Sequence, residues 1–271
     1  MKIHPLFLAL SLGLATLSFG QEKITKGSKN LPLKGESFRL NGRDAFVILP
    51  KQVDGETPWI WYAPTLRGLP AKDEVWMFDR FLAKGIAIAG IDVGESYGNP
   101  EGRKAFSDLY QYLITQRKFS RKPCLLARSR GGLMLYNWAV ENPGKVGGIA
   151  GIYPVCNLES YPGLKNAAGA YKMNAEELKS KLSQHNPIES LKPLAGAGVP
   201  ILHLQGDSDT VVPHQKNTAI LADRYRGFGG SAEVELIKGQ GHNMWRGWFE
   251  SERLTNFAIA RALGDDLLKK K

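Results

Sequence analysis

The sequence consists of short apolar runs that alternate with amphipathic segments. Unbroken apolar runs occur at 58–64, 86–93, 123–127 and 146–155. Helical patterns lie between them, as in 75–82, where the apolar residues share one face and Gly85 ends the helix. Strands that are apolar on both faces and alternate with helices form a mostly parallel sheet with helices on both faces. The alternation predicts an α/β fold, and 271 residues are enough for one large domain.

Two stretches depart from this alternation. Asn41 and Gly42 separate two strand-like runs, which predicts an antiparallel hairpin at the start of the sheet. Between about 157 and 197 short helical segments predict a small cap over the carboxyl ends of the strands. The remaining segments continue the strand and helix alternation: a strand at 199–209, a helix at 214–229, a strand at 232–237 and one final helix at 244–263.

Residues 1–20 combine an early lysine, an apolar run and small residues at the end, which are the three regions of a signal peptide. The apolar run is too short to span a bilayer comfortably. We expect cleavage before Gln21, so that residues 21–271 form a single secreted or periplasmic domain that does not contact the membrane.

The formal net charge of +10 raises the question of nucleic-acid binding. The basic residues are spread along the chain, however, and no nucleic-acid motif is present. A solvated basic surface is the preferred interpretation, and we expect no nucleic-acid partner.

The two cysteines, Cys124 and Cys156, fall near opposite ends of neighbouring predicted strands, too far apart for a disulfide. We expect two free, buried thiols. No pair of histidines has the spacing of metal ligands, so we expect no metal site.

The segment LLARSRGGLMLYNW, residues 125–138, runs from an apolar strand through Ser129 into a helix. A sharp strand–serine–helix turn can lift the hydroxyl clear of the sheet as a nucleophile elbow. Ala127 and Gly131 supply the small residues that the turn needs, although Ala127 stands where the motif has glycine. A serine that only caps the helix is the alternative.

A serine nucleophile needs a base and a carboxylate that orients the base. Asp207 and Asp209 come just after the apolar residues of the strand segment at 199–209, and His242 lies in a glycine-bordered loop after the next strand. The chain order is therefore serine, aspartate, histidine. Glu159, after the preceding strand, is an alternative acid.

In this order and context the sequence resembles the α/β-hydrolase serine hydrolases over nearly all of the chain after residue 20. The resemblance implies that Asp209 is the acid, that His242 is the base and that no cofactor is required. It also implies an oxyanion hole formed by the backbone N–H of Arg130 and by an N–H from Thr65 or Leu66. The family often has His-Gly in the latter loop, which this sequence lacks.

Arg130 follows the nucleophile at the start of a helix, where the dipole disfavours a cation. Its guanidinium could assist the oxyanion, as in glucuronoyl esterases, which also carry arginine after the nucleophile. It could instead bind a substrate anion together with Arg67 or Arg246, or form an ion pair with Glu95. These interpretations stay open for Arg130.

Other residues near the predicted site are less specific. For Arg128 a structural role is preferred. Tyr97 and Trp245 are candidates for stacking on a sugar or aryl group, although core packing is the more frequent role of aromatic residues.

Together these features predict an exported serine hydrolase that cleaves a carboxylic ester, with a carbohydrate-linked ester as one substrate. The sequence has no large accessory domain of the kind that prolyl-oligopeptidase-type peptidases carry. A small-substrate peptidase or a dienelactone-type hydrolase is the enzymatic alternative, and a ligand-binding protein on a hydrolase scaffold is the alternative from another class. The oligomeric state stays open.

Overall fold

The computed structural model describes residues 24–53 and 55–264. The strands of the described residues are β1 (Ile24–Lys26), β2 (Glu36–Leu40), β3 (Arg43–Ile48), β4 (Trp59–Tyr62), β5 (Ala87–Ile91), β6 (Cys124–Arg128), β7 (Gly148–Ile152), β8 (Ile201–Gly206) and β9 (Ala232–Ile237). The helices are α1 (Val75–Ala83), α2 (Pro100–Gln116), α3 (Gly131–Glu141), α4 (Leu164–Ala167), α5 (Ala175–Ser180), α6 (Leu182–His185), α7 (Lys192–Gly196), α8 (Thr218–Gly227), α9 (Arg246–Phe249) and α10 (Glu252–Leu263).

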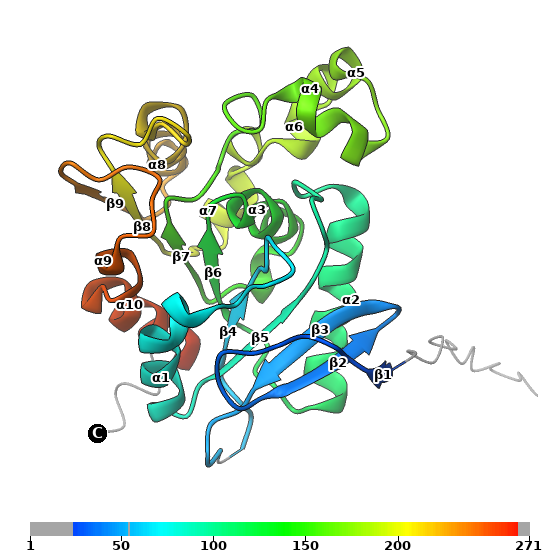
Figure 1. Cartoon of the computed structure of the whole chain (residues 1–271). Helices are drawn as coiled ribbons and strands as arrows, with labels where there is room; N and C mark the ends of the chain where they lie inside the picture. Colours follow the sequence, from blue (N-terminus) through cyan, green and yellow to red (C-terminus); the bar gives the residue numbers. More distant parts are fainter. Residues whose placement is uncertain (1–23, 54, 265–271) are drawn as a thin grey trace, which may run out of the picture.

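All nine of these strands join one sheet in the order β1-β2-β3-β5-β4-β6-β7-β8-β9 (Figure 1). The β2–β3 hairpin pairs antiparallel. Strands β4 to β9 all pair parallel with one another. The expected α/β architecture and the hairpin at Asn41-Gly42 are therefore confirmed. Parallel strands end at the same edge, so the loops after β4, β6, β8 and β9 come together there.

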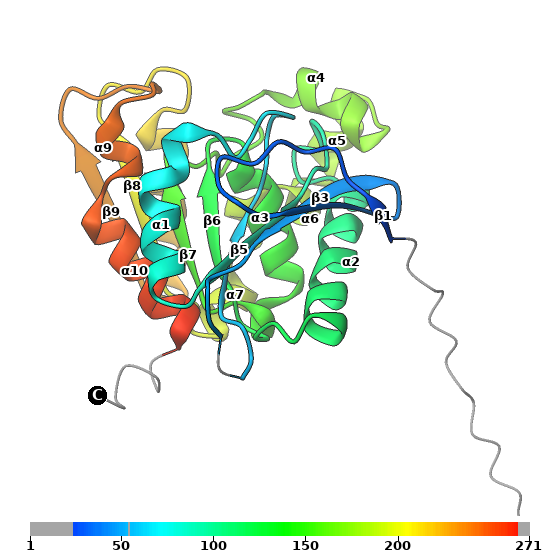
Figure 2. The ribbon, with the colours of Figure 1, turned by 60° about the horizontal axis from the view of Figure 1, so that its bottom comes forward.

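Two helical layers cover the sheet, as Figure 2 shows from a second side. One buried cluster holds side chains from α2, α3, α7 and α8, and the other holds side chains from α1, α9 and α10. Strand β6 alternates between them, with Leu125 in the first cluster and Leu126 in the second. This alternation is why the strands read as continuous apolar runs in the sequence.

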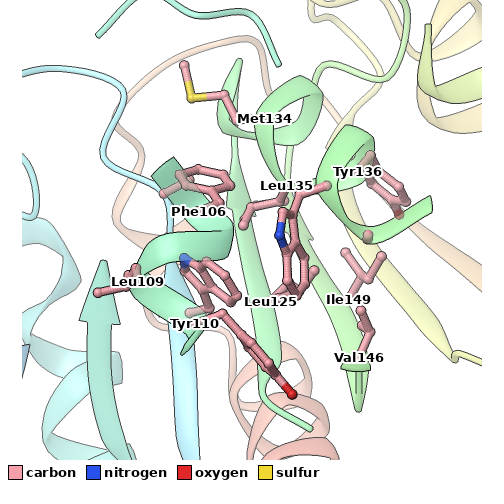
Figure 3. Close-up of a cluster of buried hydrophobic side chains, with 14 of the residues drawn as sticks. Phe106, Leu109, Tyr110, Leu125, Met134, Leu135, Tyr136, Val146 and Ile149 are labelled. Carbon is pink, nitrogen blue, oxygen red and sulfur yellow. The ribbon is translucent and has the colours of Figure 1, made fainter. Parts of the chain in front are cut away.

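The first cluster is rich in large side chains (Figure 3). Phe106 of α2, Leu135 of α3 and Leu125 of β6 all belong to this cluster. Each fully buried side chain of this size contributes about 1.5–3 kcal/mol to folding. This packing fixes α3, and therefore the turn that precedes it, against the sheet.

The cap interrupts the alternation between β7 and β8, as the sequence predicts. Helices α4, α5 and α6 lie beyond the ends of β6 and β7, at the top of Figure 1. A third buried cluster joins the cap to the main body through Leu133 of α3 and through Val212, after β8.

The structure differs from the sequence analysis at two places. Strand β1, which was not predicted, pairs with β2 at the edge of the sheet. The final helix expected at 244–263 is two helices, α9 and α10, because Ser251 caps a new helix start through its side chain and the N–H of Leu254 (3.2 Å).

Cys124 and Cys156 are both buried and free, as expected. The expected signal peptide and its cleavage site lie outside the described residues. Within the described part, no helix combines the length and apolar character needed to cross a bilayer.

A buried histidine gives the fold a pH dependence. His203 on β8 is fully buried, and its Nε2 lies 2.7 Å from the hydroxyl of Tyr136. Burial lowers the pKa of His203 to about 3 from an ordinary value of 6.5. The folded protein keeps the ring neutral while the unfolded chain takes up a proton as the pH falls through 6.5.

We therefore expect the free energy of unfolding to fall by about 2 kcal/mol from pH 7 to pH 5 through this residue alone. Replacing His203→Gln removes this contribution, so the variant should lose less stability over the same interval. Urea unfolding of both proteins at the two pH values measures the difference. An equal loss in wild type and variant would exclude His203 as the source.

Candidate functional site

Ser129 forms a strained turn between β6 and α3. Its φ is +49°, in the left-handed region that non-glycine residues rarely adopt. Its main chain is held on both sides: its N–H donates to Ile152 (3.0 Å), and its carbonyl accepts from Gly132 (2.9 Å) and Val155 (2.8 Å). The turn therefore has the strand–strained serine–helix geometry of a nucleophile elbow.

Glycines allow α3 to begin close to its neighbours. A Cβ at Gly132 would lie 2.3 Å from the carbonyl oxygen of Val155, closer than two atoms can approach. A Cβ at Gly131 would lie 3.4 Å from both the Ala63 carbonyl oxygen and Thr65 Cγ2. The elbow therefore packs closely against the loop after β4 on one side and against the segment after β7 on the other.

The structure brings Ser129, His242 and Asp209 into one hydrogen-bonded chain. Ser129 Oγ lies 2.9 Å from His242 Nε2, and His242 Nδ1 lies 2.9 Å from Asp209 Oδ2. The Asp209 side chain is fully buried, whereas the His242 ring is partly exposed. This arrangement can take a proton from the serine hydroxyl and stabilise the charge that then develops on the ring.

The carboxylate of Asp209 is surrounded by donors. Its Oδ1 accepts the N–H groups of Val211 (3.0 Å) and Val212 (2.8 Å), and its Oδ2 also accepts the amide of Gln205 (3.1 Å). Burial alone raises the pKa of Asp209, but the hydrogen bonds from His242 and the backbone outweigh burial and lower this pKa. The side chain therefore stays charged at neutral pH.

The alternative acid, Glu159, is an exposed residue at the start of the cap. The other sequence candidate, Asp207, accepts the N–H of Gly239 (2.7 Å) and braces the loop that leads to His242. Of the three acidic residues considered from the sequence, Asp209 is the one hydrogen-bonded to His242.

Two aromatic residues support the His242 ring. The ring of Tyr153, at the end of β7, lies 4.3 Å from that of His242 between centroids, and Trp248 packs against the other edge of Tyr153. Tyr153 has a φ of +36°, a second strained residue beside the site. From the sequence Tyr153 was only one of several aromatic residues near the cap, because no local pattern indicates its contact with His242.

The loop expected to complete the oxyanion hole lies beside the elbow. Thr65 is buried and contacts the start of α3, whereas Leu66 is 56% exposed. This loop and the one after β5 line a cavity of about 310 Å³, whose walls are Pro64, Thr65, Leu66, Arg67, Asp92, Gly94 and Glu95. Through Thr65, which lies beside Gly131, this cavity borders the start of α3.

Arg130 is held by two neighbours. Its Nη2 forms an ion pair with Glu95 (2.9 Å), the partner considered from the sequence, and its Nη1 donates to the hydroxyl of Tyr161 in the cap (3.2 Å). Its Nε is buried and has no hydrogen-bond partner among the described residues. The two contacts with Glu95 and Tyr161 use two of the five N–H groups and fix the guanidinium between the loop after β5 and the cap.

The remaining sequence candidates occupy the surroundings of the site. Arg67 is exposed on the wall of the cavity, and its carbonyl accepts from the buried ammonium of Lys29 (3.1 Å). Tyr97 lies in the loop after β5, where its backbone carbonyl accepts from a cap tyrosine. Trp245 is 41% exposed and packs edge-on against Trp248.

Arg128 points to the opposite side of the elbow and pairs with the buried Glu74, which the sequence analysis did not single out. A lone glutamate in a helical segment gives no sequence signal for such a contact. Among the residues that the structure describes, no three His, Cys, Asp or Glu side chains cluster so that they could hold a metal ion.

No protein-family model and no curated protein matches the sequence, but solved structures do. S-formylglutathione hydrolase from Agrobacterium tumefaciens matches with a TM-score of 0.67 at 14% identity, over 87% of this chain and 97% of that protein. A truncated carbohydrate esterase from gut microbiota matches with a TM-score of 0.63 at 15% identity, over 82% and 91%. The chain has the α/β-hydrolase fold.

An acylaminoacyl peptidase from Pyrococcus horikoshii is similar as well, with a TM-score of 0.65 at 14% identity, over 93% of this chain but 42% of the peptidase. The α/β-hydrolase fold is thus shared by esterases and by peptidases of much greater length. In this fold the nucleophile, acid and base follow in chain order on loops at one edge of the sheet. Ser129, Asp209 and His242 occur in that order here.

Proposed function

We propose that the protein is a serine hydrolase that cleaves carboxylic esters through an acyl-enzyme. The observation that carries the proposal is the hydrogen-bonded chain from Ser129 through His242 to the buried Asp209, set on a strained elbow. Its position in an α/β-hydrolase fold supports the same activity. A binding protein would gain nothing from the strain at Ser129 or from a base aligned with its hydroxyl.

In the proposed reaction Ser129 Oγ attacks the ester carbonyl carbon while His242 Nε2 takes the hydroxyl proton. The tetrahedral oxyanion accepts hydrogen bonds from the N–H of Arg130 and from an N–H of Thr65 or Leu66. His242 then gives the proton to the departing alcohol, which leaves an ester on Ser129. Water then attacks this ester while His242 takes its proton, and the acid is released as His242 returns the proton to Ser129.

We propose a carbohydrate-linked ester as the substrate. The 310 Å³ cavity between the loops after β4 and β5 is lined by Thr65 and by the charged side chains Arg67, Asp92 and Glu95, groups that can hydrogen-bond sugar hydroxyls. The exposed ring of Trp245 offers a stacking surface at the His242 loop. The signal-peptide features of residues 1–20 support export, which would bring the enzyme to such polymers.

The proposal is tested by measuring hydrolysis of p-nitrophenyl acetate, followed by acetylated, feruloylated and uronate sugar esters. We expect wild type to turn over the aryl ester and Ser129→Ala to show only background. Peptide p-nitroanilides distinguish the peptidase alternative. A folded wild type that hydrolyses none of these compounds would contradict the proposal and favour a binding role. Sequencing the N-terminus of secreted material tests export, which predicts a start near Gln21.

Replacing Arg130→Ala should raise KM more than it lowers kcat. Its Nη2 pairs with Glu95, which lines the cavity, and its Nη1 donates to Tyr161 of the cap, so the guanidinium is placed to contribute to substrate binding. We expect about a tenfold rise in KM for a uronate ester, the loss of one charged hydrogen bond, and a smaller change for a neutral ester. A kcat that falls more than a hundredfold at unchanged KM would instead assign the guanidinium to the oxyanion.

A further inference from the structure

A buried ion pair lies directly behind the candidate nucleophile. Arg128, the residue before Ser129, pairs with Glu74, and their side chains are 12% and 2% exposed. The Glu74 carboxylate has two further donors, the hydroxyl of Tyr62 (2.8 Å) and the N–H of Ala71 (2.8 Å). Three partners therefore hold the Glu74 carboxylate at a fixed position.

The other side of the guanidinium reaches the elements that carry the base. Arg128 Nη2 lies 3.0 Å from the sulfur of Met244, two residues after His242, and its Cζ lies 4.9 Å from the ring centre of Phe249 in α9. Burial raises the pKa of Tyr153 and the neighbouring Arg128 guanidinium acts to lower it, so the two side chains lie close together; the Tyr153 ring in turn contacts His242. The ion pair thus connects to the His242 loop by two routes.

Burying such a pair is costly, and well-packed apolar side chains of similar volume often stabilise a protein as well or better. The pair touches the turn before α1, the elbow strand, the end of β7 and the His242 loop, which are the parts that must be aligned for proton transfer. Its position and cost together indicate a role beyond stability.

We propose that the Glu74–Arg128 pair is a positioning device that fixes the His242 loop against the elbow and keeps the charge behind the base neutral. The inference rests on the proposed function, because it assigns His242 as the base. Neither residue touches substrate in this account; both act through Tyr153 and Met244.

The charge part of the inference has a definite sign. The titratable and charged groups around His242 are Asp209, its hydrogen-bond partner; Asp207, which braces its loop; Tyr153, against its ring; and, behind Tyr153, Arg128, Glu74 and Tyr62. With the pair intact, Arg128 and Glu74 cancel. Removing one partner leaves the other as an uncompensated charge in a poorly hydrated site.

Glu74→Gln leaves a positive charge behind His242, so protonating the ring becomes harder. The acid limb of kcat/KM should therefore move to lower pH, by on the order of half to one pH unit. Arg128→Met leaves the Glu74 carboxylate without its counter-charge, with Tyr62 and Ala71 as its remaining donors, so the acid limb should move to higher pH by a similar amount. Damage to the structure alone would not shift the limb in opposite directions.

Two further variants separate charge from position. The double variant Glu74→Gln with Arg128→Met is neutral, so its limb should return to the wild-type pH while kcat stays reduced by about tenfold, because the link to Met244 is lost. Arg128→Lys keeps the charge and should also keep the wild-type limb. These two variants test the proposal even where a single variant fails to fold.

The matched control is Glu36→Gln, on β2. It breaks an ion pair with Arg117 (2.8 Å) at the surface and should leave the pH profile unchanged. NMR titration of the His242 ring, assigned by its loss in His242→Gln, reports the same shifts without turnover. An inactive wild type would therefore contradict the proposed function, whereas identical titrations in the single variants, or shifts in the same direction, would contradict the inference.

Discussion

Replacing Asp209→Asn is expected to lower kcat by about 10⁴-fold with little change in KM. All four groups around the carboxylate are donors: the N–H groups of Val211 and Val212, the Gln205 amide and His242 Nδ1. An asparagine that keeps its oxygen toward the two backbone N–H groups turns its NH₂ toward His242. The ring then adopts the tautomer with its proton on Nε2, and this tautomer cannot accept the proton of Ser129.

The control for this prediction is Glu159→Gln, which removes the alternative acid. Glu159 is exposed, and Asp209 is the carboxylate hydrogen-bonded to His242, so we expect kcat of Glu159→Gln to stay within about twofold of wild type. Steady-state kinetics of the two variants on one aryl ester decides between the acids. The account is wrong about the acid if Asp209→Asn is active and Glu159→Gln is not.

Replacing Gly132→Ala should lower the free energy of unfolding by about 3 kcal/mol and reduce activity as well. The new Cβ would lie 2.3 Å from the carbonyl oxygen of Val155 and 2.9 Å from its nitrogen, and neither backbone atom can yield as a flexible side chain would. The N–H of Val155 also donates to the carbonyl of Ser129 (2.8 Å). Moving this segment therefore distorts the elbow.

Chemical denaturation measures this loss, with Gly144→Ala as the matched control. A Cβ at Gly144 meets nothing within 4 Å, so the control should change the free energy of unfolding by less than about 0.5 kcal/mol. Equal stability of the two variants would mean that α3 does not approach Val155 as closely as the structure shows.

The sheet could be predicted from the sequence because its central strands, β4 to β8, are buried on both faces. The parallel strands read as continuous apolar runs, and Asn41-Gly42 indicated the hairpin. Strand β1 was missed because a three-residue edge strand with exposed side chains has no such pattern. The break at Ser251 was missed because the apolar spacing continues through it.

The candidate site was predictable to the extent that each residue has a local context. Ser129 lies between strand β6 and helix α3. Asp209 follows β8, and His242 follows β9. The Glu74–Arg128 pair has no local context: its partners are 54 positions apart, and only the packed fold brings them together. The contact of Tyr153 with His242 was missed for the same reason.

The central claim, that Ser129 is the activated nucleophile, is tested most directly by labelling with a fluorophosphonate and mapping the modified peptide by mass spectrometry. The account predicts one modification at Ser129 in folded wild type, none in Ser129→Ala, and strongly slowed labelling in His242→Gln, because the base is missing. A wild type that resists labelling, or a label on another serine, would contradict it.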